Sequence, residues 1–308
     1  MAAGGARDTS LKVEVRPPWP YRLPRGGGGD GVMRVRGGIV TRLLHVDGRP
    51  VVTHAWQRRD GCVALRASVG DGEAPARGAL EIAIERIRFA FGVDDDYTDF
   101  YESFRSDRLV RRAVSRRPWT RPWRRPWPWE ALAWAVTKQL IESPRAAAIQ
   151  RRIVWRWGPR VDWDGGSLRD VPGAGVIAGR APAELAGMDL SPSRALALVK
   201  VAREVATGRA ELSGAEADRR LVAIPGIGPW TVQCLGLYGR GDADCLPAGD
   251  LGFLKLIGRL GGLGRRATPD EVEEFFAPYA PFRGLAGTFV LRAYHSLVAK
   301  GPPLRVAA

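Results

Sequence analysis

A short glycine-containing turn and one downstream carboxylate are the residues with the clearest potential for chemistry. Residues 224–228 read Ile-Pro-Gly-Ile-Gly and lie between two segments with helical spacing. Such a turn exposes backbone N–H groups at the start of its second helix, where they can bind an anion, and a DNA phosphate is the expected ligand. Asp250 follows 22 residues after Gly228, at the start of a later helix. Its carboxylate is therefore a candidate for chemistry on a nucleotide that the turn holds.

Each half of this pattern has a simpler explanation when it is taken alone. A Gly-x-Gly turn also forms ordinary corners between packed helices. An Asp at a helix start is usually an N-cap that accepts hydrogen bonds from the backbone. The proline before Gly226, the flanking helices and the basic composition of the chain favour the phosphate-binding interpretation. Beside such a site, Asp250 becomes a candidate catalytic residue.

The charge of the chain indicates a polyanionic partner. Its 308 residues include 47 basic and 33 acidic side chains, a net charge of +14. A GC-rich genome explains why arginine replaces lysine, but it does not explain the excess of basic residues. Residues 101–160 contain 15 basic and 4 acidic residues, so their charge of 15 − 4 = +11 makes up most of the total. We expect nucleic acid as the partner and a binding face near this segment.

The cysteines and histidines exclude several classes of site. Cys62, Cys234 and Cys245 are too few and too scattered for a disulfide framework, and they lack the spacing of a zinc or iron–sulfur site. The three histidines are dispersed as well. Neither a signal peptide nor a run of about 18 uncharged apolar residues is visible. These observations favour a cytoplasmic protein in a reducing compartment, without a membrane partner.

The periodicity predicts an α+β chain with a strand-rich first part and a helical remainder. Residues 1–10 are expected to form a disordered tail, residues 11–93 an α+β domain, residues 94–300 a helical domain and residues 301–308 a second tail. Strand-like runs occur in the first domain at 11–15, 32–35, 51–56 and 62–67, before an amphipathic helix at 79–91.

Everything after residue 94 is expected to be helical apart from its connections. The predicted helices cover 96–114, 130–139, 143–157, 182–186, 191–207, 214–222, 229–238, 251–260, 268–276 and 281–299. The hairpin between two of them spans 221–232. Residues 116–129 form an Arg/Pro/Trp linker, because four prolines prevent a regular helix there. The tryptophans of this linker either pack against the two domains or contact nucleic acid.

These motifs resemble one superfamily of enzymes. Leu221–Trp230, followed by Cys245–Leu251, is similar to the helix-hairpin-helix/Gly-Pro-Asp DNA glycosylases, and most similar to DNA-3-methyladenine glycosylase II, the AlkA type. Residues 130–141 resemble the early helix of that family and its Gln-containing turn. Residues 185–206 resemble the helix before the hairpin, and Pro-Phe-Arg at 281–283 resembles a C-terminal Pro-Trp-Arg segment. The first domain resembles the TATA-binding-protein-like α+β domain that precedes the all-α helix-hairpin-helix glycosylase fold in this group.

The resemblance implies a monofunctional DNA glycosylase of base excision repair. It would hydrolyse the N-glycosidic bond of flipped-out alkylated purines such as 3-methyladenine, with Asp250 stabilising the positively charged sugar and orienting the attacking water. Related bifunctional enzymes carry a lysine two residues after the second glycine, where this chain has Trp230, so no lyase activity is expected. No cofactor is required. The resemblance also implies a structural Na⁺ or K⁺ on the backbone carbonyls of Val222, Ile224 and Ile227.

Further site residues follow from the resemblance. The substrate pocket is expected to include Trp230, Gln139, Cys234 and Leu291. The expected DNA contacts are Gly226, Ile227, Gly228, Pro229, Thr231, Leu140, Ile141, Arg219 and Arg220. Leu140 and Ile141 are candidates for an apolar wedge that fills the gap left by the flipped base, with core packing as the alternative. Cys234 and Leu291 stand where relatives carry aromatic residues, which leaves the substrate range open.

The partner implied is damaged double-stranded DNA, bound by a monomeric protein in the bacterial cytoplasm and, through DNA, at the nucleoid. Two alternatives remain at this level. One is a glycosylase for oxidised or deaminated purines. The other is a non-catalytic DNA-binding protein that uses the hairpin alone, and Asp250 is the residue that separates it from an enzyme.

Overall fold

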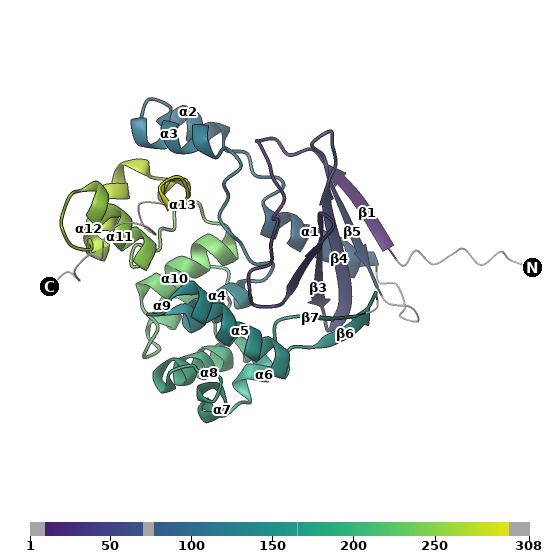
Figure 1. Ribbon diagram of the computed structural model, residues 1–308. Helices are drawn as coiled ribbons and strands as arrows, with labels where there is room; N and C mark the ends of the chain where they lie inside the picture. Colours follow the sequence, from purple (N-terminus) through teal and green to yellow (C-terminus); the bar gives the residue numbers. More distant parts are fainter. Residues whose placement is uncertain (1–9, 70–76, 165, 296–308) are drawn as a thin grey trace, which may run out of the picture. The chain divides into compact units, whose positions relative to one another are not determined.

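The computed structural model describes residues 10–69, 77–164 and 166–295 (Figure 1). The chain forms two compact units, each assembled from separate stretches of sequence. The first, here called the sheet unit, comprises Met1–Pro17, Arg22–Asp94 and Val136–Ala210. The second, the hairpin unit, comprises Pro18–Tyr21, Asp95–Ala135 and Glu211–Ala308. The predicted tails at 1–10 and 301–308 lie outside the described residues, except for Ser10, which begins the first strand.

The sheet unit is built on a five-stranded antiparallel sheet with the strand order β1-β5-β4-β3-β2. Its strands are β1 (Ser10–Val15), β2 (Met33–Arg36), β3 (Ile39–Val46), β4 (Arg49–Gln57) and β5 (Val63–Ser68). Asp47 and Gly48 connect β3 to β4 with φ angles of 50° and 77°. Positive φ at both central residues is the requirement of a tight hairpin turn, which Asp-Gly satisfies. The predicted combination of a sheet with helices is confirmed.

Helix α1 (Arg77–Phe91) packs against β1, β3, β4 and β5 (Figure 1). Leu80, Ile84 and Ile87 of this helix are buried, as its amphipathic pattern predicts. Leu43 and Val52 form a cross-strand pair in β3 and β4, and both pack against Leu168. The sheet thus buries apolar side chains against a helix and against a second, smaller sheet.

That smaller sheet corrects the prediction that everything after residue 94 is helical. Strands β6 (Arg160–Trp163) and β7 (Gly166–Arg169) pair as an antiparallel hairpin. The hairpin packs through Val161 and Trp163, which alternate with charged residues along β6. Four residues are too few for a period-two pattern to stand out from its helical surroundings.

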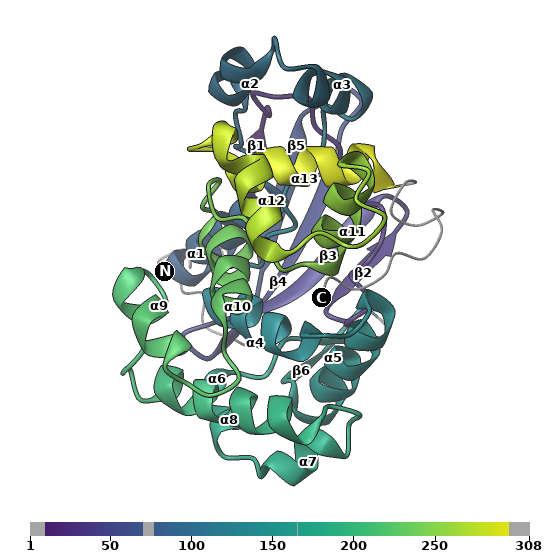
Figure 2. The ribbon, with the colours of Figure 1, turned by 90° about the vertical axis from the view of Figure 1, so that its left-hand side faces the viewer.

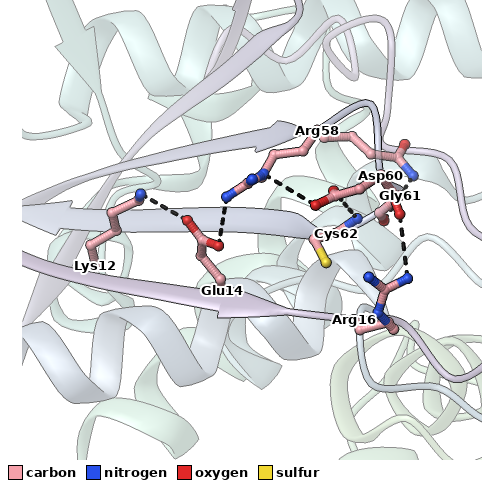
Figure 3. Close-up of polar contacts among 8 residues, drawn as sticks. Lys12, Glu14, Arg16, Arg58, Asp60, Gly61 and Cys62 are labelled. Atoms are coloured by element: carbon pink, nitrogen blue, oxygen red, sulfur yellow. Dashed lines mark hydrogen bonds and ion pairs between the residues drawn. The ribbon is translucent and has the colours of Figure 1, made fainter.

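The edge strand β1 carries charged side chains that are linked to one another (Figure 3). Lys12 Nζ lies 2.8 Å from Glu14 Oε1, and Arg58 donates to the other oxygen of Glu14 at 2.8 Å. Arg58 Nε also lies 3.5 Å from Asp60. The hydrogen bond from Lys12 is the main reason that the pKa of Glu14 is lowered. Exposed ion pairs stabilise little, but charges on an edge strand oppose pairing with other chains.

Among the remaining helices of the sheet unit, the predicted ones at 143–157, 182–186 and 191–207 agree closely with the structure, whereas a short helix at 174–178 was not predicted. These helices are α5 (Ser143–Trp157), α6 (Ala174–Ala178), α7 (Pro182–Ala186) and α8 (Pro192–Ala206). Both α6 and α7 pack on α8. Helix α4 (Pro128–Lys138) belongs to both units, because the division falls between Ala135 and Val136.

The hairpin unit consists of helices around one aromatic core. It contains α2 (Thr98–Phe104), α3 (Arg108–Arg116), α9 (Ala215–Val222), α10 (Pro229–Cys234), the π-helix η1 (Leu235–Arg240), α11 (Leu251–Leu260), α12 (Pro269–Phe276), the short 3₁₀-helix η2 (Ala277–Tyr279) and α13 (Arg283–Ala293). Phe100, Phe253, Phe276 and Phe289 belong to its buried cluster. Figure 2 shows α9 and α10 joined by their turn, and α3 beside α13.

A break inside the first predicted helix is the second correction. The pattern at 96–114 predicts one helix, but α2 ends at Phe104 and α3 begins at Arg108. Asp107 causes the break because its carboxylate accepts a hydrogen bond from the Val110 N–H at 2.8 Å, as an N-cap does. Residues 117–127 contain no helix, as their prolines require. None of the described helices combines the length and the apolar composition that a membrane span requires.

Candidate active site

The turn between α9 and α10 presents an open backbone surface. Gly226 has φ +92°, a conformation that strongly favours glycine. Gly228 has extended backbone and is the N-cap of α10, and a Cβ built there would meet no atom within 4 Å. Among the described residues, the Gly228 N–H has no acceptor. The protein itself therefore leaves room for an external group to approach this N–H.

The turn is fixed from within. Ile227 is buried and its N–H donates to the Ile224 carbonyl at 3.0 Å, which closes the turn. Arg240, the last residue of η1, donates two hydrogen bonds to Asp218 of α9 at 2.6 and 3.0 Å and a third to the Leu212 carbonyl at 2.7 Å. A bidentate pair of this kind restricts geometry as well as adding energy. The pair with Asp218 connects α9 to η1, on either side of the turn.

Some of the predicted DNA-contacting residues at the hairpin are exposed, and others have buried side chains. Gly226, Pro229, Arg219 and Arg220 are exposed. The Arg219 guanidinium donates to Glu216 at 2.5 Å, and this bond raises the pKa of Arg219. Ile227 and Thr231 have buried side chains, so they can offer a ligand only their backbone.

Asp250 lies at the N-terminus of α11, in the same unit as the hairpin. The Gly252 N–H donates to its Oδ1 at 2.9 Å, and its own N–H donates to the Pro247 carbonyl at 2.8 Å. The simpler interpretation as an N-cap is therefore correct as a description of its structure. The cap also orients the carboxylate, and the positive end of the helix dipole stabilises its negative charge. Capping and a chemical role are compatible at this position.

Apolar side chains approach Asp250 from two other helices. A Cβ on Gly249 would lie 3.5 Å from Cβ and Cδ1 of Trp230, so the tryptophan packs against the residue before the carboxylate. A Cβ on Gly252 would lie 3.3 Å from both δ-carbons of Leu291 and 3.1 Å from Oδ1 of Asp250. The absence of side chains at these two glycines lets α10 and α13 flank the carboxylate. Trp230 and Leu291 thus both lie near Asp250, and their role as pocket residues stays a prediction.

Tyr238 lies on the same helix face as the predicted pocket residues Trp230 and Cys234, and it was not predicted from the sequence as a site residue. Trp230, Cys234 and Tyr238 follow one another at intervals of four, which places them on one helix face. Burial raises the pKa of Tyr238 well above its ordinary value, with Cys234 and Asp250 acting in the same direction and Arg292 opposing them. The phenol therefore stays protonated in the field of Asp250. The interval of four was the available signal. The π-helical turn that carries Tyr238 is a form often found at functional sites.

Gln139, Leu140 and Ile141 belong to the sheet unit, in the turn between α4 and α5. Leu140 is 103% exposed and has φ +57°, so it makes no core contact and holds a conformation that disfavours leucine. Arg194 of α8 donates to the carbonyls of Thr137 and Gln139 at 3.2 and 3.0 Å. The exposure of Leu140 shows that the core-packing alternative is wrong for this residue. Arg194, which bonds to the turn, was not predicted from the sequence. Ile141 is half-buried.

The predicted cation ligands have suitable chemistry. Val222 is the last residue of α9, where carbonyls lack partners within the helix and the dipole is negative. The Ile224 carbonyl accepts the turn hydrogen bond but keeps a second lone pair. Neutral oxygens at a helix C-terminus fit a monovalent cation. Within residues 10–69, 77–164 and 166–295, no group of three or more His, Cys, Asp or Glu side chains is arranged to hold a metal ion.

The chain has relatives among known proteins. No protein-family model matches the chain. A DNA-3-methyladenine glycosylase of Bacillus subtilis is 26% identical over 221 residues, which cover 70% of this chain and 73% of that protein. A probable bifunctional transcriptional activator/DNA repair enzyme AlkA of Mycobacterium tuberculosis is 28% identical over 310 residues. That match covers 98% of this chain but only 60% of the mycobacterial protein.

A solved structure shows the same fold. The 3-methyladenine DNA-glycosylase from Archaeoglobus fulgidus superposes with a TM-score of 0.77 at 20% identity, covering 94% of this chain and 99% of that protein. The resemblance predicted from the hairpin and Asp250 is thereby confirmed: the chain has sequence homologues named DNA-3-methyladenine glycosylase and AlkA, and it shares the fold of the Archaeoglobus enzyme.

Proposed function

We propose that this chain is a monofunctional DNA glycosylase of base excision repair that removes alkylated purines such as 3-methyladenine from damaged duplex DNA. One observation carries the proposal. A helix-capping carboxylate, Asp250, lies beside Trp230 and Leu291 in the same unit as a hairpin whose backbone is open to a phosphate. The names of the sequence relatives support the same activity.

Binding begins with the duplex. The Gly228 N–H and the start of α10 contact a phosphate, and the exposed guanidinium of Arg220 adds attraction for the backbone. The damaged nucleotide is flipped out of the stack, and Leu140 enters the gap that it leaves. The flipped base enters the pocket beside Trp230, whose ring offers a stacking surface worth about 1–3 kcal/mol per base.

The chemical step breaks the C1′–N bond, with its electron pair leaving on the base. Positive charge develops on the sugar, and the carboxylate of Asp250 stabilises it. Asp250 also orients a water whose oxygen forms the new bond to C1′ and whose proton passes to the carboxylate and then to solvent. An alkylated purine already carries a positive charge, so it leaves without a protonating acid. The residues flanking Asp250 limit the access of other water.

Hydrolysis is expected to stop at the abasic site. A lyase reaction needs an amine that attacks the sugar, and the position two residues after Gly228 carries an indole, Trp230. Borohydride treatment of the reacting enzyme should therefore trap no covalent complex with DNA. A trapped complex would refute the monofunctional assignment.

Finer features complete the proposal. Residues 11–93, with their sheet and α1, would correspond to a TATA-binding-protein-like domain. Residues 94–300, which contribute to both compact units, would correspond to the helix-hairpin-helix glycosylase domain. A structural Na⁺ or K⁺ on the carbonyls of Val222, Ile224 and Ile227 would stabilise the hairpin without entering the reaction. The enzyme needs no other cofactor and acts as a monomer in the bacterial cytoplasm.

The Asp250→Asn variant tests the proposal. Asparagine also caps helices, so the fold should persist while base release is abolished and DNA binding is retained. Asp107→Asn, at the N-cap of α3, is the matched control and should keep full activity. Base release would be measured on DNAs carrying 3-methyladenine, 7-methylguanine, hypoxanthine or 8-oxoguanine. Retained activity in Asp250→Asn, or release of only the last two bases by the wild type, would overturn the assignment.

A further inference from the structure

Helix α3 presents a face made almost entirely of arginine. Arg108, Arg111, Arg112 and Arg116 are exposed and follow the spacing of one helix face. We call these four residues the α3 arginine face. The opposite side of the helix is apolar: Val110, Ala113 and Val114 are buried, and α3 packs on α13 (Figure 2).

The guanidinium groups of the α3 arginine face have no acidic partner among the described residues. Arg116 lies over the ring of Tyr294, with 6.0 Å between Cζ and the ring centroid. The nearest acid in sequence, Asp107, is engaged as the N-cap of α3 and accepts from the Tyr279 hydroxyl at 3.2 Å. Like charges at these spacings repel one another along a helix. A polyanion would remove that repulsion.

In the basic linker that follows α3, by contrast, arginines are paired with acidic residues. Arg124 forms an ion pair with Asp95 at 2.5 Å, and Arg125 forms one with Glu130 at 3.1 Å. Arg121 donates to the Pro20 carbonyl at 3.0 Å. These linker arginines serve the interior of the hairpin unit. Within the basic segment 101–160, the α3 arginine face is therefore a part that remains available to a partner.

The α3 arginine face is separate from the phosphate-binding hairpin. In both views of the molecule, α3 lies at one end of the hairpin unit and the α9–α10 turn lies toward the other (Figures 1 and 2). A phosphate held by Gly228 is therefore not the phosphate that α3 would meet. Any ligand of α3 is a second segment of nucleic acid or a second partner.

The chemistry of the face favours nucleic acid over protein. Protein interfaces have a core of apolar and aromatic residues, and charged residues are depleted there. The large exposed hydrophobic side chains among the described residues are found elsewhere than on α3. Guanidinium groups repeated along a helix match a row of phosphates, which they contact without reading the base sequence.

We propose that the α3 arginine face is a second DNA-binding surface, which contacts backbone phosphates beyond the segment that the hairpin holds. This proposal rests on the proposed function, because the proposed function identifies DNA as the ligand. Its contribution is independent of sequence and of damage, so it strengthens binding to undamaged duplex and leaves the chemical step unchanged.

The test replaces Arg108, Arg111, Arg112 and Arg116 together by glutamine, which has nearly the same helix propensity as arginine. The control replaces four arginines that are already paired with carboxylates, at the same cost in net charge: Arg77, Arg160, Arg180 and Arg209. Affinity for an undamaged duplex of about 40 base pairs, roughly 130 Å long at 3.4 Å per step, is measured by fluorescence anisotropy across a salt series.

Each neutralised phosphate contributes about 0.9 to the slope of log affinity against log salt, so loss of four contacts should flatten the slope by about 3.6. The control should lose much less. A slope equal to that of the control would overturn the proposal, and an acidic protein would then be the partner to seek.

Single-turnover base release from a short damaged duplex separates this proposal from the proposed function. An unchanged rate in the glutamine variant is expected and also shows that it is folded. Failure of the wild type to release any base would refute the glycosylase assignment, whereas the salt slope would still report on α3.

Discussion

Replacing Leu140 by asparagine should make the protein more stable and less active. The leucine side chain is 103% exposed, so its removal costs no buried contact and leaves no cavity. Its φ of +57° costs an ordinary L-residue about 1–2 kcal/mol, whereas asparagine enters this conformation readily. We therefore expect the free energy of unfolding to rise by about 1 kcal/mol, or the melting temperature by roughly 1–2 °C in a chain of 308 residues.

The expected loss of activity follows from the wedge role that we propose for the leucine. Burying a leucine between bases stabilises the flipped state by about 1.5–3 kcal/mol, which asparagine would not supply. At 1.4 kcal/mol for each factor of ten, base release from duplex DNA should fall by roughly 10- to 100-fold. Single-stranded DNA leaves no gap to fill, so its rate should not change.

The assay compares single-turnover base release from the same lesion in duplex and in single-stranded DNA. Leu140→Met keeps an apolar side chain and should keep most of the duplex rate. Leu196→Asn removes another exposed leucine, on α8, and should leave both rates unchanged. If Leu140→Asn keeps the duplex rate, or loses the single-strand rate equally, the wedge assignment is wrong. If its stability falls, the argument from backbone strain is wrong.

Three further predictions concern other features. Arg194→Ala removes both hydrogen bonds to the α4–α5 turn and should lower duplex base release about 10-fold, near 1.4 kcal/mol, while the single-strand rate is kept and Arg194→Lys restores part of the loss. Gly236→Ala places a Cβ within 2.9 Å of the Cys245 Cβ and should lower the denaturation midpoint by the equivalent of about 1–3 kcal/mol, partly rescued by Cys245→Ala. Arg265, through its hydrogen bond, lowers the pKa of Glu271 from its usual 4.5 to about 2. The stability that this carboxylate contributes is therefore complete above pH 4.5 and is lost as the pH falls toward 2. Glu271→Gln should lack this pH dependence when acid unfolding is measured.

Local signals in the sequence were enough for the elements whose ends are marked by their own residues. The predicted helices 143–157 and 251–260 agree with α5 and α11 because a proline and an aspartate mark their starts. The break at Asp107 was missed because apolar spacing continues across it. Strand β3 was not predicted because its sequence lacks strict alternation. Leu43 and Leu44 are both fully buried, one on each face of the sheet. The β6–β7 hairpin was too short to be recognised.

The candidate site divides in a similar way. Asp250 and Trp230 could be predicted as site residues because motif spacing carries information about a turn and a helix start. Their proximity, through Gly249, depends on how helices pack, which no spacing along one helix reveals. Arg194 was missed because it donates to main-chain carbonyls. Every residue has such a carbonyl, so the residue type at the acceptor position gives no signal in the sequence. The excess charge of segment 101–160 can be counted from the sequence, but only the structure separates the α3 arginine face from the arginines of the segment that are paired with carboxylates.

The discontinuous make-up of the two units has a consequence for synthesis of the protein on the ribosome. Every stretch of the sheet unit has been made once Ala210 is complete, whereas the hairpin unit still lacks everything from Glu211 onward. Asp95–Ala135 must therefore wait for partners from α9 to α13, with Phe100 and Val110 lacking the core in which they are later buried. We expect the nascent chain to expose apolar surface during this interval. The turn at 224–228 and Asp250 both follow residue 210, so a chain that ends at Ala210 lacks the proposed active site.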